Sequence, residues 1–177
     1  MKLLTTLLFL SACTIPDSHK LHMEHVSNFV RPIEKESLAP LKGWKEVLSR
    51  QPVATGANKP TYEVMKQIND DCNKKDYKLT PKWSTPNEFA MSSTSDCKGF
   101  AVCKYYALRK AGFNADQLNL WSGDYTHKAH LMLTASINNK QYALDIGAES
   151  NLPEAKNYFY KNFQPTYRFN EMGWAVN

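Results

Sequence analysis

The first part of the chain carries apolar residues at helical intervals. Residues 41–51 and 61–75 repeat apolar side chains every three or four positions, which predicts two amphipathic helices. A longer helix is predicted after Ser95 or Asp96, either of which can cap it, and Gly112 is its expected stop. The core-facing stripe expected for this helix consists of Phe100, Cys103, Ala107 and Ala111.

The second part of the chain changes to a period of two. Residues 117–121, 130–137 and 141–146 alternate in the manner of half-buried strands. Two adjacent asparagines join the last two of these strands, and asparagine tolerates the positive φ of a tight hairpin turn. The stretch from Asn151 onward is aromatic and irregular, with one strand expected near "TYRF".

The chain begins with a short apolar run behind one lysine, "MKLLTTLLFLSAC". The run is too short to span a bilayer, and the small residues before Cys13 predict a lipoprotein signal over residues 1–12, with lipid attached to the Cys13 sulfur. An ordinary signal peptide, with Cys13 incidental, is the alternative. Thr14 is not the aspartate that retains lipoproteins at the inner membrane, so we expect a periplasmic protein anchored to the outer membrane. Residues 13–40 then form a tether with a loosely packed leading segment, and residues 41–177 form one domain.

Charge narrows the class of partner. The 177 residues hold 22 Lys and Arg against 17 Asp and Glu, a formal net charge of +5 without a long basic run. This argues against nucleic acid as a partner. Three histidines of the tether recur at a spacing of three, but no Cys, Asp or Glu cluster completes a metal-ligand set, so we interpret them as part of a solvated linker. They are His19, His22 and His25.

Four cysteines leave an odd thiol once Cys13 is lipidated. Cys97 and Cys103 lie six positions apart on one predicted helix, roughly 240° around its axis, so they should not bridge each other. Cys72 and Cys103 either form a disulfide or remain two buried thiols.

Three residues supply the chemistry of a thiol-dependent hydrolase. Such an enzyme needs a thiolate, an imidazole that pairs with it, and an acceptor that orients the imidazole. Cys97 lies in the first turn of the predicted helix, where the dipole and unfilled N–H groups stabilise a thiolate. His130 opens one strand, and Asp145 lies near the end of the next. Each residue alone has a bland structural explanation, but together they favour a catalytic triad; the competing histidine, His127, is expected to be exposed.

The contact between His130 and Asp145 depends on the register of the hairpin. A two-residue turn at Asn138 and Asn139 places Asp145 opposite Met132, on the face that also carries His130. A three-residue turn would place Asp145 on the other face, because a slip of one residue inverts the faces. The triad therefore requires the two-residue turn.

Five blocks of sequence carry a resemblance to a known family. In chain order they are "WSTPNEF", "DCKGFAVCKYYALRKAG", "HLML", "ALDI" and "PTYRFNEMGW". From Tyr62 to the C-terminus the chain resembles the bacterial transglutaminase-like cysteine proteinases, the family of LapG-like periplasmic proteases. The resemblance implies a papain-like α+β fold, with the catalytic Cys at a helix N-terminus packed on an antiparallel sheet that carries His and Asp. It also implies the triad Cys97, His130 and Asp145.

The resemblance further implies a substrate and a partner. Members of the family cleave a peptide bond in a large cell-surface adhesin and so control attachment in biofilms, and an inner-membrane receptor for cyclic di-GMP sequesters the protease. We therefore expect a periplasmic cysteine endopeptidase with an adhesin as substrate and such a receptor as a candidate partner. Trp83 is a candidate oxyanion donor through its indole N–H, alongside the backbone N–H of Cys97; a core tryptophan is the alternative.

Two positions depart from the family pattern. The family usually has acidic residues directly after the catalytic Cys, which with the preceding Asp help to bind calcium. Here Asp96 remains as a calcium candidate, but Lys98 and Gly99 replace the acids. A hard cation loses oxygen ligands and meets an ammonium, which argues against calcium binding, and no cofactor is expected to be required. The Asn that follows the triad Asp in the family is Ile146 here, which puts one supporting contact in doubt.

Two other functions fit the same sequence. An acyl-transfer enzyme, a transglutaminase or an amidase, would use the same fold and the same thiol, and an added amine acceptor would distinguish it. A catalytically idle lipoprotein that binds an adhesin or a receptor is the alternative from another class. It predicts that Cys97→Ala leaves the phenotype intact.

Overall fold

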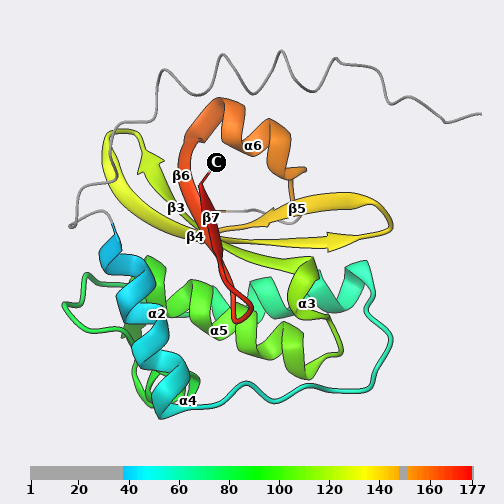
Figure 1. Cartoon of the computed structure of the whole chain (residues 1–177), viewed down its shortest axis with the longest axis horizontal. Helices are drawn as coiled ribbons and strands as arrows, with labels where there is room; N and C mark the ends of the chain where they lie inside the picture. Colours follow the sequence, from blue (N-terminus) through cyan, green and yellow to red (C-terminus); the bar gives the residue numbers. More distant parts are fainter. Residues whose placement is uncertain (1–37, 148–150, 177) are drawn as a thin grey trace, which may run out of the picture. The chain divides into compact units, whose positions relative to one another are not determined.

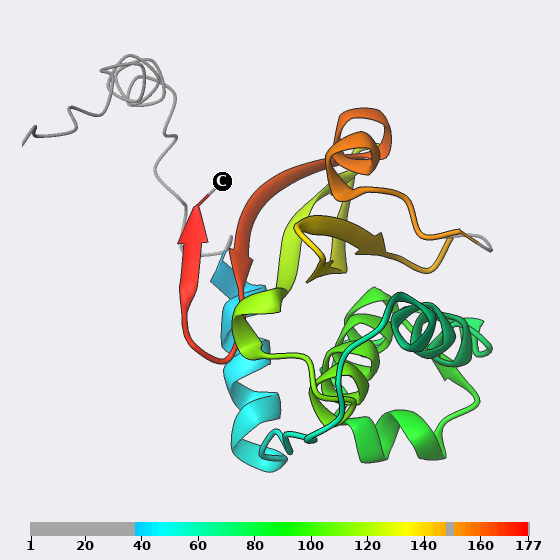
Figure 2. The same ribbon diagram turned by 90° about the vertical axis from the view of Figure 1, so that its right-hand side faces the viewer.

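A five-stranded sheet lies between two layers of helices (Figures 1 and 2). The structure is a computed structural model, and it describes residues 38–147 and 151–176. The helices are α2 (Ala39–Arg50), α3 (Tyr62–Cys72), α4 (Pro86–Met91), α5 (Cys97–Lys110) and α6 (Ala155–Asn162), with a 3-10 turn η2 (Ala115–Gln117). The strands are β1 (Asp76–Tyr77), β2 (Thr94–Ser95), β3 (Leu118–Tyr125), β4 (Lys128–Ile137), β5 (Lys140–Leu144), β6 (Phe163–Phe169) and β7 (Trp174–Val176).

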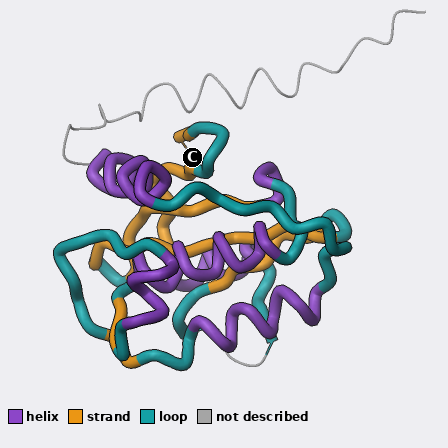
Figure 3. The backbone as a smooth tube through the Cα atoms, turned by 90° about the horizontal axis from the view of Figure 1, so that it is seen from below, coloured by secondary structure: helices purple, strands orange, loops and turns teal. Residues whose placement is uncertain are grey.

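The sheet has the order β5-β4-β3-β6-β7, and each neighbouring pair is antiparallel. Strands β1 and β2 form a separate parallel pair of two residues each. Figure 3, seen from the side of α2 to α5, shows these helices in front of the strands. The predicted α+β class is confirmed.

Alternation along the strands builds a separate core on each face of the sheet. Leu120 of β3 and Leu133 of β4 belong to the core that α5 shares with α2 and α3. Trp121 and Met132, one position away, belong to the smaller core under α6. Because side chains of a strand point alternately to opposite faces, a period of two supplies apolar residues to both layers.

Helix α5 begins and ends at the residues that the sequence indicates. Asp96 is the N-cap, and its side chain accepts hydrogen bonds from the backbone N–H groups of Lys98 and Gly99. Gly112 follows the C-cap with a φ of +96°, a region that favours glycine. The cap and the stop therefore define a helix whose first residue is Cys97.

The core-facing stripe predicted for α5 is wrong in part. Phe100 is buried, whereas Cys103, Ala107 and Ala111 are only partly buried. The reason is that α5 packs on the sheet, on α3 and on α4, so it buries more than the single face of a surface helix. Its other buried residues include Val102, Lys104, Tyr105, Tyr106 and Leu108.

The hairpin between β4 and β5 has the predicted two-residue turn. Ile137 pairs with Lys140 and Leu133 pairs with Leu144, so paired residue numbers sum to 277. Asn138 and Asn139 have φ values of 50° and 60°, as a tight hairpin requires. The predicted register is therefore confirmed.

The C-terminal part has more structure than the sequence indicates. The strand expected near "TYRF" is β6, which pairs with β3 inside the sheet. Helix α6 and the edge strand β7 are elements that the sequence analysis does not identify. None of the described helices has the length and apolar character needed to cross a bilayer.

A disulfide joins the end of α3 to the middle of α5. Cys72 and Cys103 are bonded, with their Cα atoms 6.4 Å apart, which resolves the two alternatives left by the sequence. Among the described cysteines Cys97 is the free thiol, and it is buried. Cys13, the predicted lipidation site, and the three histidines of the predicted tether lie outside the described residues.

Candidate active site

The thiol of Cys97 stands at the start of the central helix. Cys97 is the first residue of α5, directly after the capping Asp96, and is 8% exposed. The cap fixes the direction in which α5 starts, because the Asp96 carboxylate accepts from two backbone N–H groups of the first turn. The sequence therefore places a single thiol at the positive end of a helix dipole.

The hairpin brings His130 and Asp145 together. His130 lies near the start of β4, and Asp145 follows the last residue of β5. His130 Nε2 is 2.8 Å from Asp145 Oδ2 and 2.9 Å from Oδ1. The two-residue turn is what permits this contact, since a slip of one residue would move Asp145 to the opposite face.

The imidazole of His130 also contacts the thiol of Cys97. The two side chains interact, and because Asp145 occupies Nε2, the ring nitrogen left for the sulfur is Nδ1. Burial would lower the pKa of His130, but the hydrogen bonds with Asp145 and Cys97 outweigh it and raise the pKa to about 9. The ring is therefore positively charged at neutral pH.

Asp145 is held as a charged acceptor. Burial would raise the pKa of Asp145, but the hydrogen bonds with His130 and Tyr158 outweigh it and keep the pKa below its usual value. The Tyr158 hydroxyl of α6 donates to Asp145 Oδ2 at 2.7 Å, and the backbone N–H of Ile146 donates to Oδ1 at 2.7 Å. Asn73, next to the disulfide, donates its side-chain amide to the Asp145 carbonyl at 3.0 Å. Although Ile146 replaces the family's Asn, the Asp145 carboxylate still has three partners: His130, Tyr158 and the backbone N–H of Ile146.

Two aromatic rings lie near the imidazole of His130, and a third lies near Cys97. The ring of Tyr125 lies 5.4 Å from the imidazole and that of Phe163 lies 6.1 Å from it, measured between centroids. Tyr77 of β1 is 52% exposed, and its hydroxyl interacts with Cys97. Sequence reasoning missed Tyr77, because nothing local connects a two-residue strand with a helix twenty positions later.

A glycine stands opposite His130 in the sheet. Gly123 of β3 pairs with His130, and the pairing of β3 with β6 shifts register between Ser122 and Gly123. A Cβ at Gly123 would lie 2.2 Å from the carbonyl oxygen of Gln164 and 2.7 Å from the Phe163 ring. A glycine is therefore needed where β6 approaches β3 beside the imidazole.

A buried lysine lies behind Asp145. Lys104 of α5 is 1% exposed, and its ammonium donates to the Leu144 carbonyl at 3.3 Å. Burial lowers the pKa of Lys104 to about 7, against the raising effect of the Asp145 charge. From pH 7 to about 10.5 the unfolded chain binds a proton that the folded chain does not, so this residue makes stability rise with pH.

We expect Lys104→Met to stabilise the protein at about pH 7, by roughly 2 kcal/mol or about 4–8 °C in melting temperature, because methionine fills similar space without a buried ammonium. The advantage should shrink as pH rises and vanish near 10.5, where both states of wild type hold a neutral amine. Thermal melts across this range measure it. The matched control is Lys110→Met, at the exposed end of the same helix. A stability gain of Lys104→Met that grew with pH would contradict the lowered pKa of Lys104.

Trp83 packs against helix α2. A Cβ built on Gly43 would lie 2.1 Å from the Trp83 indole nitrogen, so the indole lies directly on the α2 backbone. The ring belongs to the rim of the main core, which is the alternative that the sequence left open. Its role as an oxyanion donor stays a prediction.

Asp96, the calcium candidate, is already engaged. Its carboxylate accepts from the first turn of α5, from Thr80 and from the ammonium of Lys98. Within residues 38–147 and 151–176, no three His, Cys, Asp or Glu side chains gather in a group that could hold a metal ion. His127 is exposed in the β3–β4 turn, as expected.

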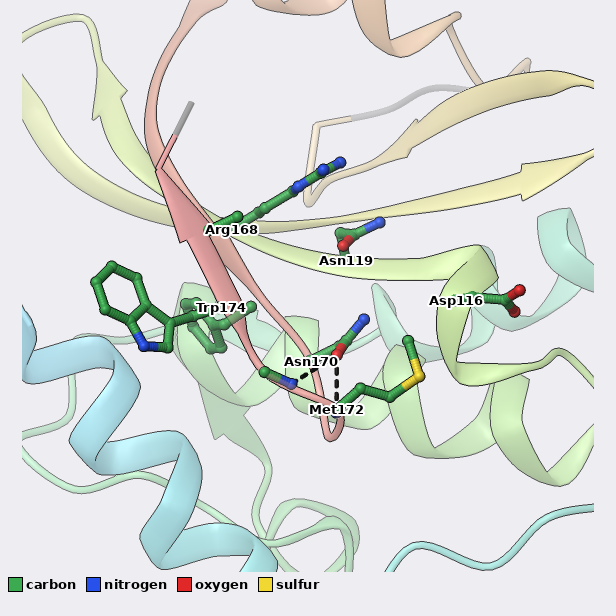
Figure 4. Close-up of a pocket in the computed structure, with 9 residues that line it drawn as sticks. Asp116, Asn119, Arg168, Asn170, Met172 and Trp174 are labelled. Atoms are coloured by element: carbon green, nitrogen blue, oxygen red, sulfur yellow. Dashed lines mark hydrogen bonds between the residues drawn. The ribbon is translucent and has the colours of Figure 1, made fainter. Parts of the chain in front are cut away.

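Two hollows differ in their relation to these side chains. One of about 220 Å³ is lined by both His130 and Asp145, and also by Tyr125 and Tyr158. Another, of about 320 Å³, lies beside β6 and β7 and contains none of the three candidate residues (Figure 4). The first hollow therefore adjoins His130 and Asp145, while Cys97 is not among the residues that line it.

The sheet, the central helix and the Cys at its N-terminus define the papain-like, transglutaminase-like class of α+β folds. Solved structures of Legionella pneumophila LapG share the fold: the calcium-bound form has a TM-score of 0.60 and 21% identity, over 89% of this chain and 86% of that chain. The EGTA-treated form has the same TM-score and identity, over 89% and 84%. No family model and no curated protein matches the chain. At this identity the likeness establishes the fold.

Proposed function

We propose that the protein is a cysteine endopeptidase with the triad Cys97, His130 and Asp145. The observation that carries the proposal is the position of one imidazole, which contacts a helix-terminal thiol on one side and a buried carboxylate at 2.8 Å on the other. A positively charged ring beside the sulfur favours the thiolate, the nucleophilic form.

Each residue has one role in the proposed reaction. The Cys97 sulfur attacks the peptide carbonyl, and His130 gives its proton to the leaving amine. Water then attacks the thioester, with neutral His130 as the base, and Cys97 leaves as the thiolate. Asp145 keeps Nε2 protonated and the ring oriented. The Tyr77 hydroxyl, which contacts Cys97, is placed to donate to the developing oxyanion, together with the Cys97 backbone N–H.

We further propose that the substrate is a large surface adhesin, and that the protein acts in the periplasm on a lipid anchor at Cys13. The fold of LapG and the lipoprotein-like start of the chain support this proposal. A cyclic di-GMP receptor at the inner membrane is the proposed regulator. A tethered enzyme meets only those substrates that pass within reach of its membrane.

A peptide library separates the candidate activities. Purified protein is incubated with a proteome digest, and new N-termini are identified by mass spectrometry. We expect wild type and the matched control His127→Ala to create termini with a common flanking sequence, and Cys97→Ser to create none. An added primary amine that appears on the new C-termini in place of water would instead establish acyl transfer. If wild type and Cys97→Ser produced the same set of peptides, the result would favour the alternative of a catalytically idle binding lipoprotein.

A further inference from the structure

The carboxylate of Asp96 has no capacity left for a metal ion. Oδ1 accepts from the backbone N–H groups of Lys98 at 3.1 Å and Gly99 at 3.3 Å. Oδ2 accepts from the backbone N–H of Thr80 at 3.1 Å, from its hydroxyl at 2.8 Å, and from the Lys98 ammonium. A carboxylate offers about four acceptor positions, and Asp96 is 1% exposed with five donors around it.

The ammonium of Lys98 occupies the place of a cation. Its nitrogen bridges Asp96 Oδ2 and the backbone carbonyl of Thr80, the latter at 3.0 Å. A carboxylate and a backbone carbonyl are oxygen types that bind calcium in proteins. Here the positive charge between them belongs to a side chain, 21% exposed, from the first turn of α5.

This ammonium ties a loop to the nucleophile. Thr80 lies three positions after Tyr77, and the Tyr77 hydroxyl contacts Cys97. The same loop is fastened once more by the backbone N–H of Lys78, which donates to the Ser95 carbonyl at 2.7 Å. The bridge through Lys98 therefore positions the loop that carries one wall of the candidate active site.

We propose that Lys98 is a built-in cation that replaces calcium, so that the site around Cys97 assembles without a metal ion. The LapG structures include calcium-bound and EGTA-treated forms, so the exchange concerns an ion that is present in a protein of the same fold. Lys98 acts as a positioning residue: it holds Asp96 and Thr80, and through them the loop beside the thiol.

The test measures calcium response and thiol reactivity without any substrate. The purified protein is melted, and its Cys97 is alkylated with iodoacetamide at about pH 6, in EGTA and in about 1 mM calcium chloride. The rate is read by mass spectrometry on the peptide that contains Cys97. For wild type we expect the same melting temperature and the same rate in both solutions.

Variants of Lys98 supply the second arm. Lys98→Met should lower the melting temperature by roughly 5 °C and slow the alkylation roughly tenfold, because Asp96 loses its counter-charge and the loop loses its tie. Lys98→Arg should restore most of both, since it returns a cation. The matched control is Lys42→Met on the exposed side of α2, which should behave as wild type. If Lys98→Met does not fold, melting and alkylation of wild type and Lys98→Arg, each in EGTA and in calcium, still test whether the protein responds to calcium.

Either of two results would overturn the proposal. A rise in the melting temperature of wild type by roughly 5 °C in calcium would show a metal site at the calcium concentration used. Unchanged melting and alkylation in Lys98→Met would show that the ammonium positions nothing. Neither readout depends on peptide cleavage, so a protein without peptidase activity could still meet every expectation for Lys98.

Discussion

His130→Ala is expected to lower the alkylation rate of Cys97 at about pH 6 by roughly 300-fold. An ordinary thiol titrates near pH 8.5, so only about 0.3% of it is thiolate at this pH, whereas a thiol paired with imidazolium is largely thiolate. The raised pKa of His130, about 9, means that the ring still carries its proton far above pH 6. The rate of iodoacetamide labelling against pH, read on the Cys97 peptide, measures the effect.

His127→Ala is the matched control for this substitution. His127 lies three residues away, exposed in the turn between β3 and β4, and has no place in the proposed triad. Its removal should leave the labelling rate of Cys97 unchanged. If both variants and wild type shared one ordinary thiol profile, the preformed pair of Cys97 and His130 would not exist.

Asp145→Asn is expected to move the alkaline limit of activity downward. In wild type the leaving amine takes its proton from His130, so activity should fall as pH rises through about 9. Asparagine removes the charge that raises the pKa of His130, while burial, which lowers the pKa, remains. We therefore expect the alkaline limb to move toward about pH 6.5, with a loss of roughly 10²-fold at neutral pH.

The pH profile of peptide cleavage distinguishes this effect from simple damage to the fold. Asp124→Asn, an exposed carboxylate on β3, serves as the control and should retain the wild-type profile. A uniform loss of activity in Asp145→Asn with the alkaline limb still near pH 9 would mean that Asp145 does not set the charge of His130. The labelling rate of Cys97 against pH provides the same comparison without a substrate.

Local rules predicted the parts of the site that depend on neighbouring residues. The cap at Asp96 fixes where α5 begins, so the position of Cys97 follows from a few letters of sequence. The turn at Asn138 and Asn139 fixes the register, and so the meeting of His130 with Asp145. The start of the helix and the type of turn both depend on residues close together in the sequence, so periodicity and turn-forming residues predict them.

The supporting residues could not be predicted in this way. Tyr158 reaches Asp145 from α6, a helix that the sequence analysis did not identify. Asn73, just after α3, and Lys104 of α5 reach the backbone around Asp145 from two helices that the disulfide joins. Such contacts depend on how α3, α5 and α6 pack on the sheet, and no local pattern encodes that packing. The predicted stripe of α5 failed for the same reason.

The glycine opposite His130 limits how the site can diversify. Gly123 touches Phe163 and the β6 backbone so closely that any side chain would press on the ring beside the imidazole. By contrast, Tyr125 lies at the exposed rim, where a new side chain meets solvent. Evolution, or a designer who screens for a different cleavage preference, can therefore vary position 125, whereas position 123 accepts no exchange without rebuilding a neighbouring strand.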